Sequence, residues 1–68
     1  MLKREVQLTE SFCDMIRTSK NSEQAEKICE LMEEICIANN IRGLKGMWIM
    51  QQLNTAFEET YPYNGEDE

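Results

Sequence analysis

Three segments of this chain repeat apolar side chains every three or four positions, and short polar stretches separate them. This period places the apolar side chains on one face of an α-helix. It predicts helices over residues 2–18 and 22–38, and a third that begins between 41 and 47 and ends near 60. Thr9 is an alternative N-cap, with which the first helix would begin later. Because no segment alternates like a strand, the sequence predicts an all-α fold, a small three-helix antiparallel bundle.

The breaks between these segments contain residues that start and stop helices. Asn21 or Ser22 can cap the second helix, since their side-chain oxygens accept from its free amides. Gln24 follows Asn21 at the spacing of a capping box. Asn39-Asn40 predicts the end of this helix, because asparagine tolerates the left-handed backbone conformation found there.

A chain of 68 residues buries only about 60% of its unfolded surface, so additional stabilisation is expected. Cys13, Cys29 and Cys36 are an odd number of cysteines without a signal peptide, which indicates reduced core residues in the cytoplasm. The absence of histidine and of a CxxC motif disfavours a structural metal, and no cofactor is predicted. Oligomerisation or binding to a partner remains as the source of this stabilisation, so we expect the bundle to self-associate, for example as a homodimer, or to bind another protein.

The net charge of −6 disfavours direct binding to nucleic acid and to anionic membranes. No apolar stretch is long enough to span a bilayer. Pro62 ends the third helix, and we expect residues 62–68 to be an acidic, mobile tail outside a single helical domain over 1–61. Without histidine, a GxSxG motif or a phosphate-binding glycine loop, the sequence predicts no enzyme and no catalytic residue.

The run Met47-Trp48-Ile49-Met50 is too apolar for one helix face, since successive residues turn by about 100°. Ile49 and Met50 fit the core stripe, whereas Trp48 points away from it. This difference leaves two interpretations, which depend on where the third helix begins.

If the third helix begins near Ile41, a second apolar face forms and suits a partner, with a rigid aromatic as its anchor. If it begins at Met47, Gly43 and Gly46 form a turn and Trp48 covers the end of the bundle. On the first interpretation, the partner-binding residues are Ile41, Leu44, Met47 and Trp48.

Glutamates recur along one side of the second helix and form an acidic face, defined as Glu23, Glu26, Glu30, Glu33 and Glu34. This is the ordinary solvent face of an amphipathic helix, or an anionic docking surface for a basic partner. In its extreme form it would mimic DNA phosphates and occupy a nucleic-acid-binding protein.

The third helix also exposes uncharged polar residues that are able to read base edges, as in a helix-turn-helix protein. Only Arg42 and Lys45 lie near enough to hold phosphates, so charge disfavours this interpretation. The sequence instead favours a non-enzymatic protein that binds another protein as an inhibitor, antagonist or adaptor, of a kind typical of phage or mobile-element genes. A nucleic-acid mimic is the alternative.

Overall fold

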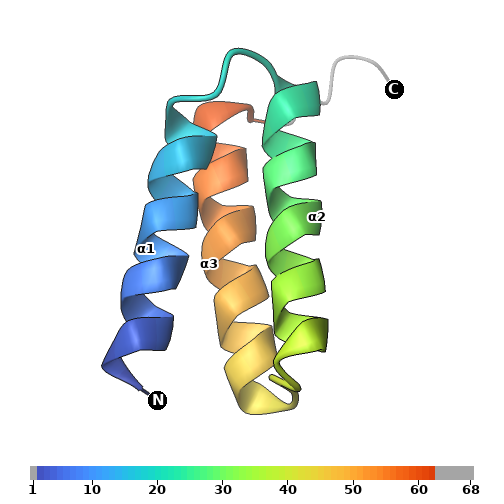
Figure 1. The fold of residues 1–68 in the computed structure, drawn as a ribbon. Helices are drawn as coiled ribbons and strands as arrows, with labels where there is room; N and C mark the ends of the chain where they lie inside the picture. Colours follow the sequence, from blue (N-terminus) through green and yellow to red (C-terminus); the bar gives the residue numbers. More distant parts are fainter. Residues whose placement is uncertain (1, 63–68) are drawn as a thin grey trace.

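The computed structural model describes residues 2–62, which form three helices: α1 (Lys3–Arg17), α2 (Ser22–Ala38) and α3 (Leu44–Thr60). The helices run up, down and up, so that α2 is antiparallel to both α1 and α3 (Figure 1). Each helix contacts both of the others, and no strand occurs within residues 2–62. The predicted all-α three-helix bundle is therefore confirmed. The predicted mobility of the tail concerns residues 63–68, which lie outside the described residues.

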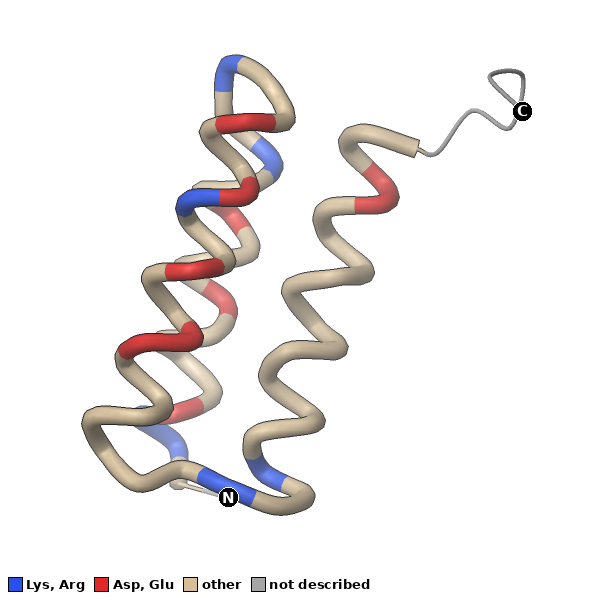
Figure 2. The backbone as a smooth tube through the Cα atoms, turned by 90° about the vertical axis from the view of Figure 1, so that its right-hand side faces the viewer, with Lys and Arg blue, Asp and Glu red and all other residues tan. Residues whose placement is uncertain are grey.

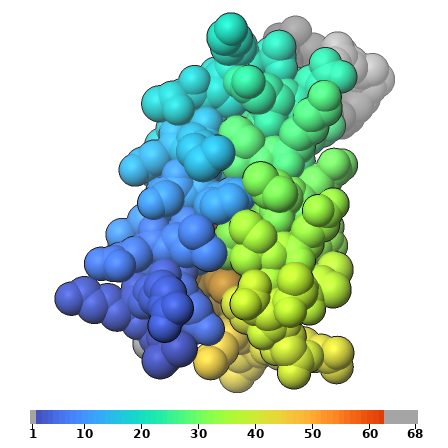
Figure 3. Space-filling view, in the orientation of Figure 1, coloured from blue at the N-terminus to red at the C-terminus, as the bar shows by residue number. Residues whose placement is uncertain are grey.

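The core is one cluster to which every helix contributes its apolar stripe. Ile16, Met32, Ile49 and Leu53 are the largest apolar side chains that are fully enclosed. The buried apolar residues are Phe12, Cys13, Ile16, Ala25, Met32, Cys36, Ile49, Leu53 and Ala56. Figure 3 shows α1 and α2 meeting in front of α3, so that one face of α3 is covered along most of its length.

Local hydrogen bonds define the start of α1. The Glu5 carboxylate accepts from the amide of Leu2 at 3.2 Å, which satisfies one donor at the N-terminus. The Thr9 hydroxyl donates to the carbonyl of Glu5 at 2.8 Å, one turn earlier in the same helix. The helix therefore runs through Thr9 and does not begin there.

Both ends of α2 follow the sequence signals. The Asn21 side chain accepts from the Gln24 amide at 2.8 Å, and the Gln24 side chain accepts from the Lys20 amide at 2.7 Å. Asn40, two residues beyond the helix, has a φ of 58°. The prediction of an asparagine cap and a left-handed asparagine at the end is confirmed.

The start of α3 lies between the two positions considered from the sequence. Gly43 has a φ of 68°, which side-chain-bearing residues rarely adopt, and it immediately precedes the helix. Gly46 lies inside the first turn, where a Cβ would stand 3.4 Å from the carbonyl oxygen of Ile41. One glycine thus makes the turn, while the other belongs to the helix.

Tyr61 ties the end of α3 to the turn between α1 and α2. Its hydroxyl donates to the carbonyl of Ser19 at 2.9 Å and lies 2.7 Å from the Ser19 hydroxyl. Its ring packs on Phe57 with centroids 5.7 Å apart. None of the helices in residues 2–62 combines the length and apolar character needed to cross a bilayer.

Candidate functional site

The first two turns of α3 present large apolar side chains to solvent. Leu44 is 82% exposed and Met47 is 67% exposed. They are three positions apart in one helix, which places them on neighbouring parts of its surface. Isolated exposed apolar residues are common, but a neighbouring pair on the outer side of a small bundle suits contact with another molecule.

Ile41 and Trp48 are placed differently from Leu44 and Met47. Both are half-buried and pack against the core cluster, Ile41 from the connection before α3 and Trp48 from the flank of α3 that faces α1. The four predicted partner-binding residues therefore do not form one uniformly exposed face. Of the four, Leu44 and Met47 are exposed.

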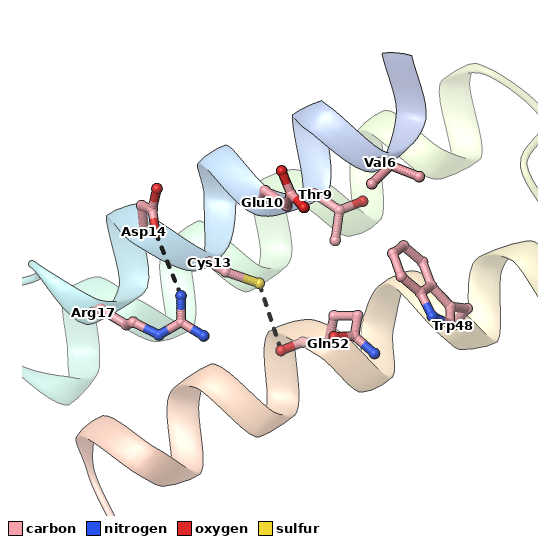
Figure 4. A pocket seen from close by; sticks show the side chains of 8 residues that line it. All are labelled: Val6, Thr9, Glu10, Cys13, Asp14, Arg17, Trp48 and Gln52. Atoms are coloured by element: carbon pink, nitrogen blue, oxygen red, sulfur yellow. Dashed lines mark hydrogen bonds and ion pairs between the residues drawn. The ribbon is translucent and has the colours of Figure 1, made fainter. Parts of the chain in front are cut away.

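A groove of about 450 Å³ runs between α1 and α3, with Trp48 at one end (Figure 4). The Cys13 thiol donates to the Gln52 carbonyl at 3.6 Å across this groove. At its other end, Arg17 lies 3.4 Å from Asp14 and 3.8 Å from Glu59. Two of these contacts link α1 to α3, the Cys13–Gln52 hydrogen bond and the Arg17–Glu59 ion pair.

The cysteines lack the environment of a nucleophile. Burial raises the pKa of all three thiols above the ordinary value. Arg17 opposes this rise at Cys13, while carboxylates near each thiol add to it. Thiolates, which are the reactive form, are therefore disfavoured at neutral pH. Within residues 2–62, histidine, cysteine and acidic side chains form no group of three able to hold a metal ion.

A second groove, of about 340 Å³, lies between α2 and α3 on the opposite flank of α3. Cys29 and Phe57 are half-buried along it, and Asn54 is the exposed α3 residue at its edge. Glu26 and Glu30 of the acidic face form the other edge. Part of the acidic face thus borders an apolar groove, which we call the α2–α3 groove and define by these five residues.

The α2–α3 groove continues toward the connection between the two helices. One turn further along α3 lies half-buried Met50, and one turn beyond it is Met47. On α2, the equivalent steps from Glu30 reach Glu33 and then Ile37, which is 73% exposed. An apolar strip at helical spacing therefore leads from Phe57 to the exposed start of α3.

The charged residues beside this strip lie on its α2 side. Figure 2 shows acidic positions along successive turns of α2, while α3 carries no charge between Lys45 and Glu58. All five glutamates of the acidic face are exposed. Among residues 2–62 the ion pairs are Arg17–Asp14, Arg17–Glu59 and Lys45–Glu5, none of which involves α2. The acidic face therefore forms no ion pair with the rest of the described chain.

Sequence reasoning predicted the acidic face of α2 and Met47 of α3 as binding residues, but it did not predict the groove between the two helices. The available signal was the uncharged stretch over 46–57, which is unusual for a helix with an exposed side. Which flank of α3 meets α2 depends on how the helices pack, and periodicity alone does not contain this information.

Compared with family models, curated proteins and solved structures, the chain matches none of them.

Proposed function

We propose that this chain is a non-enzymatic protein that acts by binding another protein, as an inhibitor, antagonist or adaptor. The observation that carries the proposal is the exposure of Leu44 and Met47 at the start of a helix whose next ten residues carry no charge. Soluble helices normally place charged residues on their exposed side. Burial of these two side chains against a partner would remove apolar surface from water.

Ile41 and Trp48 would support such a contact by fixing the position of the exposed residues. Both pack against the core, so they hold the connection and the first turns of α3 in place. The methionine side chain is flexible and polarisable, which lets it adapt to the shape of a partner. The three reduced thiols suit a reducing compartment such as the cytoplasm.

Site-specific photo-crosslinking tests this proposal. A benzophenone amino acid at position 47 should give one defined adduct in an extract of the native host, and excess unlabelled chain should compete it away. The matched control carries the same group at Gln7, an exposed residue of α1. Equal adducts from both positions, or none from position 47, would contradict the proposal. An adduct with the mass of two copies would identify self-association.

A further inference from the structure

The α2–α3 groove combines an apolar strip with charges of one sign, and this combination specifies the chemistry of an occupant. Cys29 and Phe57 line the groove with Asn54 at its edge, and Met50 and Met47 extend this apolar strip along α3 at helical spacing. From residue 47 to residue 57 it extends about 15 Å along α3, at about 1.5 Å per residue. This length matches about three turns of a helix laid along it.

We infer that the α2–α3 groove binds a basic amphipathic helix of a partner protein, an inference that rests on the proposed protein-binding function. Apolar residues of the partner, spaced at i, i+3, i+4 and i+7, would pack on the strip. Lysines or arginines on one side of that helix would face Glu26, Glu30 and Glu33 on α2. Methionine at the docking surface accommodates different apolar side chains, as in other grooves that receive helices.

Charge complementarity favours this occupant over a second copy of the chain. The seven Lys and Arg residues lie at helix ends and connections, apart from Lys27, and Figure 2 shows them toward the two ends of the bundle. No helix within residues 2–62 therefore offers a basic face to the groove. A second copy would bring a neutral or acidic face toward glutamates that form no ion pair with any residue in 2–62.

The glutamates alone would bind a basic protein through charge without regard to shape, as a phosphate mimic does. The groove adds an apolar requirement, because Cys29 and Phe57 lie half-buried between the two helices. A partner segment must then be both basic and amphipathic. This double requirement separates the inference from simple attraction between opposite charges.

The test is the affinity of labelled peptides for the full chain, measured by fluorescence anisotropy. The probe is a peptide of about 14 residues with leucines at i, i+3, i+4 and i+7 and lysines elsewhere on its surface. A scrambled peptide of equal composition and a peptide with glutamate in place of lysine are the controls. We expect saturable binding of the amphipathic basic peptide, with affinity at least about tenfold above both controls.

Two exposed neighbours on α3 provide matched variants. Asn54→Arg places a cation at the edge of the groove, whereas Thr55→Arg places it about 100° around the same helix. Both residues are exposed, so both variants should keep the wild-type circular dichroism. We expect Asn54→Arg to weaken peptide binding about tenfold and Thr55→Arg by less than about twofold.

Paired charge reversals test the acidic edge. E26K/E30K reverses two glutamates at the groove, while E10K/E34K reverses two that do not line it and gives the same net charge. We expect about tenfold weaker binding for the first variant and less than about threefold for the second.

Absence of saturable binding, equal binding of the scrambled peptide, or equal weakening within either pair of variants would overturn the inference. A dimer seen by light scattering and broken by Asn54→Arg, without peptide binding, would assign the groove to a second copy and also overturn it. The crosslink from position 47 does not depend on the peptides. If that adduct with another protein forms while the peptides fail, the protein-binding proposal stands and only the basic helix is excluded.

Discussion

On the flank of α3 that faces α1, polar contacts cross between the helices, whereas on the flank that faces α2 apolar packing alone joins them within residues 2–62. The first flank has the Cys13–Gln52 hydrogen bond and the ion pairs Lys45–Glu5 and Arg17–Glu59. The second has a groove edged by Glu26 and Glu30, which form no ion pair in the described part of the chain. The two flanks therefore differ in how α3 is held: polar contacts link it to α1, whereas apolar packing alone links it to α2 within residues 2–62.

The largest effect should come from Leu53, whose side chain is fully buried within the core that both flanks share. Leu53→Ala should lower the free energy of unfolding by about 2–5 kcal/mol, because it leaves a cavity. In a domain this small, that loss removes much of the total stability. Urea denaturation followed by circular dichroism measures the change.

The matched control for that prediction is Leu44→Ala, at an exposed leucine of the same helix. It should change the free energy of unfolding by less than about 0.5 kcal/mol. A comparable loss for both variants would mean that Leu44 belongs to the folding core, and the contrast between a buried and a partner-facing leucine would be lost.

The two glycines near the start of α3 should respond with opposite signs. Gly43→Ala forces a side-chain-bearing residue to a φ of 68° and should cost about 1–3 kcal/mol. Gly46→Ala should stabilise the helix by up to about 1 kcal/mol, because alanine loses less backbone entropy than glycine in a helix and its Cβ would lie 3.4 Å from the Ile41 carbonyl oxygen, at the short limit of ordinary contact. Thermal melts of both variants compare them directly, and equal destabilisation would refute the placement of Gly46 within the helix.

Removal of the ion pairs between α1 and α3 should lower the free energy of unfolding, although by a small amount. Arg17→Met and Lys45→Met should each lower the free energy of unfolding by about 0.2–1 kcal/mol, because these pairs are partly exposed. Lys27→Met removes a cation that forms no ion pair in the described part of the chain, and its effect should be near zero. If Lys27→Met lowered the free energy of unfolding as much as Arg17→Met and Lys45→Met at low ionic strength, ion pairs would not be what distinguishes the two flanks.

The buried thiols predict how stability depends on alkaline pH. Burial raises the pKa of Cys13, Cys29 and Cys36 in the folded state, so the unfolded chain releases these protons first. Stability contributed by the protonated thiols is fully present below the ordinary thiol pKa and is lost as pH rises through the folded value. Urea midpoints measured at increasing pH should fall above about pH 8.5. A Cys29→Ala variant should fall less steeply, and an identical slope would count against the thiols as the cause.

Periodicity predicted the three helices and the burial of Ile49, because burial of one helix face is encoded in residue spacing. The asparagine cap of α2 was also predictable, because it depends only on nearby residues: Asn21 accepts a hydrogen bond from an amide three positions away. The start of α3 was bracketed but not fixed, since Gly43 and Gly46 look alike in sequence and only one adopts a positive φ. The difference depends on where the connection from α2 must turn.

The candidate site was predictable only in pieces. The exposure of Leu44 and Met47 and the acidic face follow from helical position. The tertiary arrangement adds that Ile41 and Trp48 pack on the core, and that Glu26 and Glu30 border the same groove as Asn54 and Phe57. Such a juxtaposition joins residues far apart in the chain, so it requires the packing of the helices and not their periodicity.

Two-dimensional amide NMR of the ¹⁵N-labelled chain during titration with the amphipathic basic peptide tests the difference between the flanks most directly. We predict that the largest shift changes fall on Cys29, Met50, Asn54 and Phe57, which belong to the α2–α3 flank. Val6, Cys13 and Gln52, which line the α1–α3 groove, should shift little. Changes centred on these last three residues, or spread evenly over all helices, would contradict the assignment of the α2–α3 flank as the binding surface.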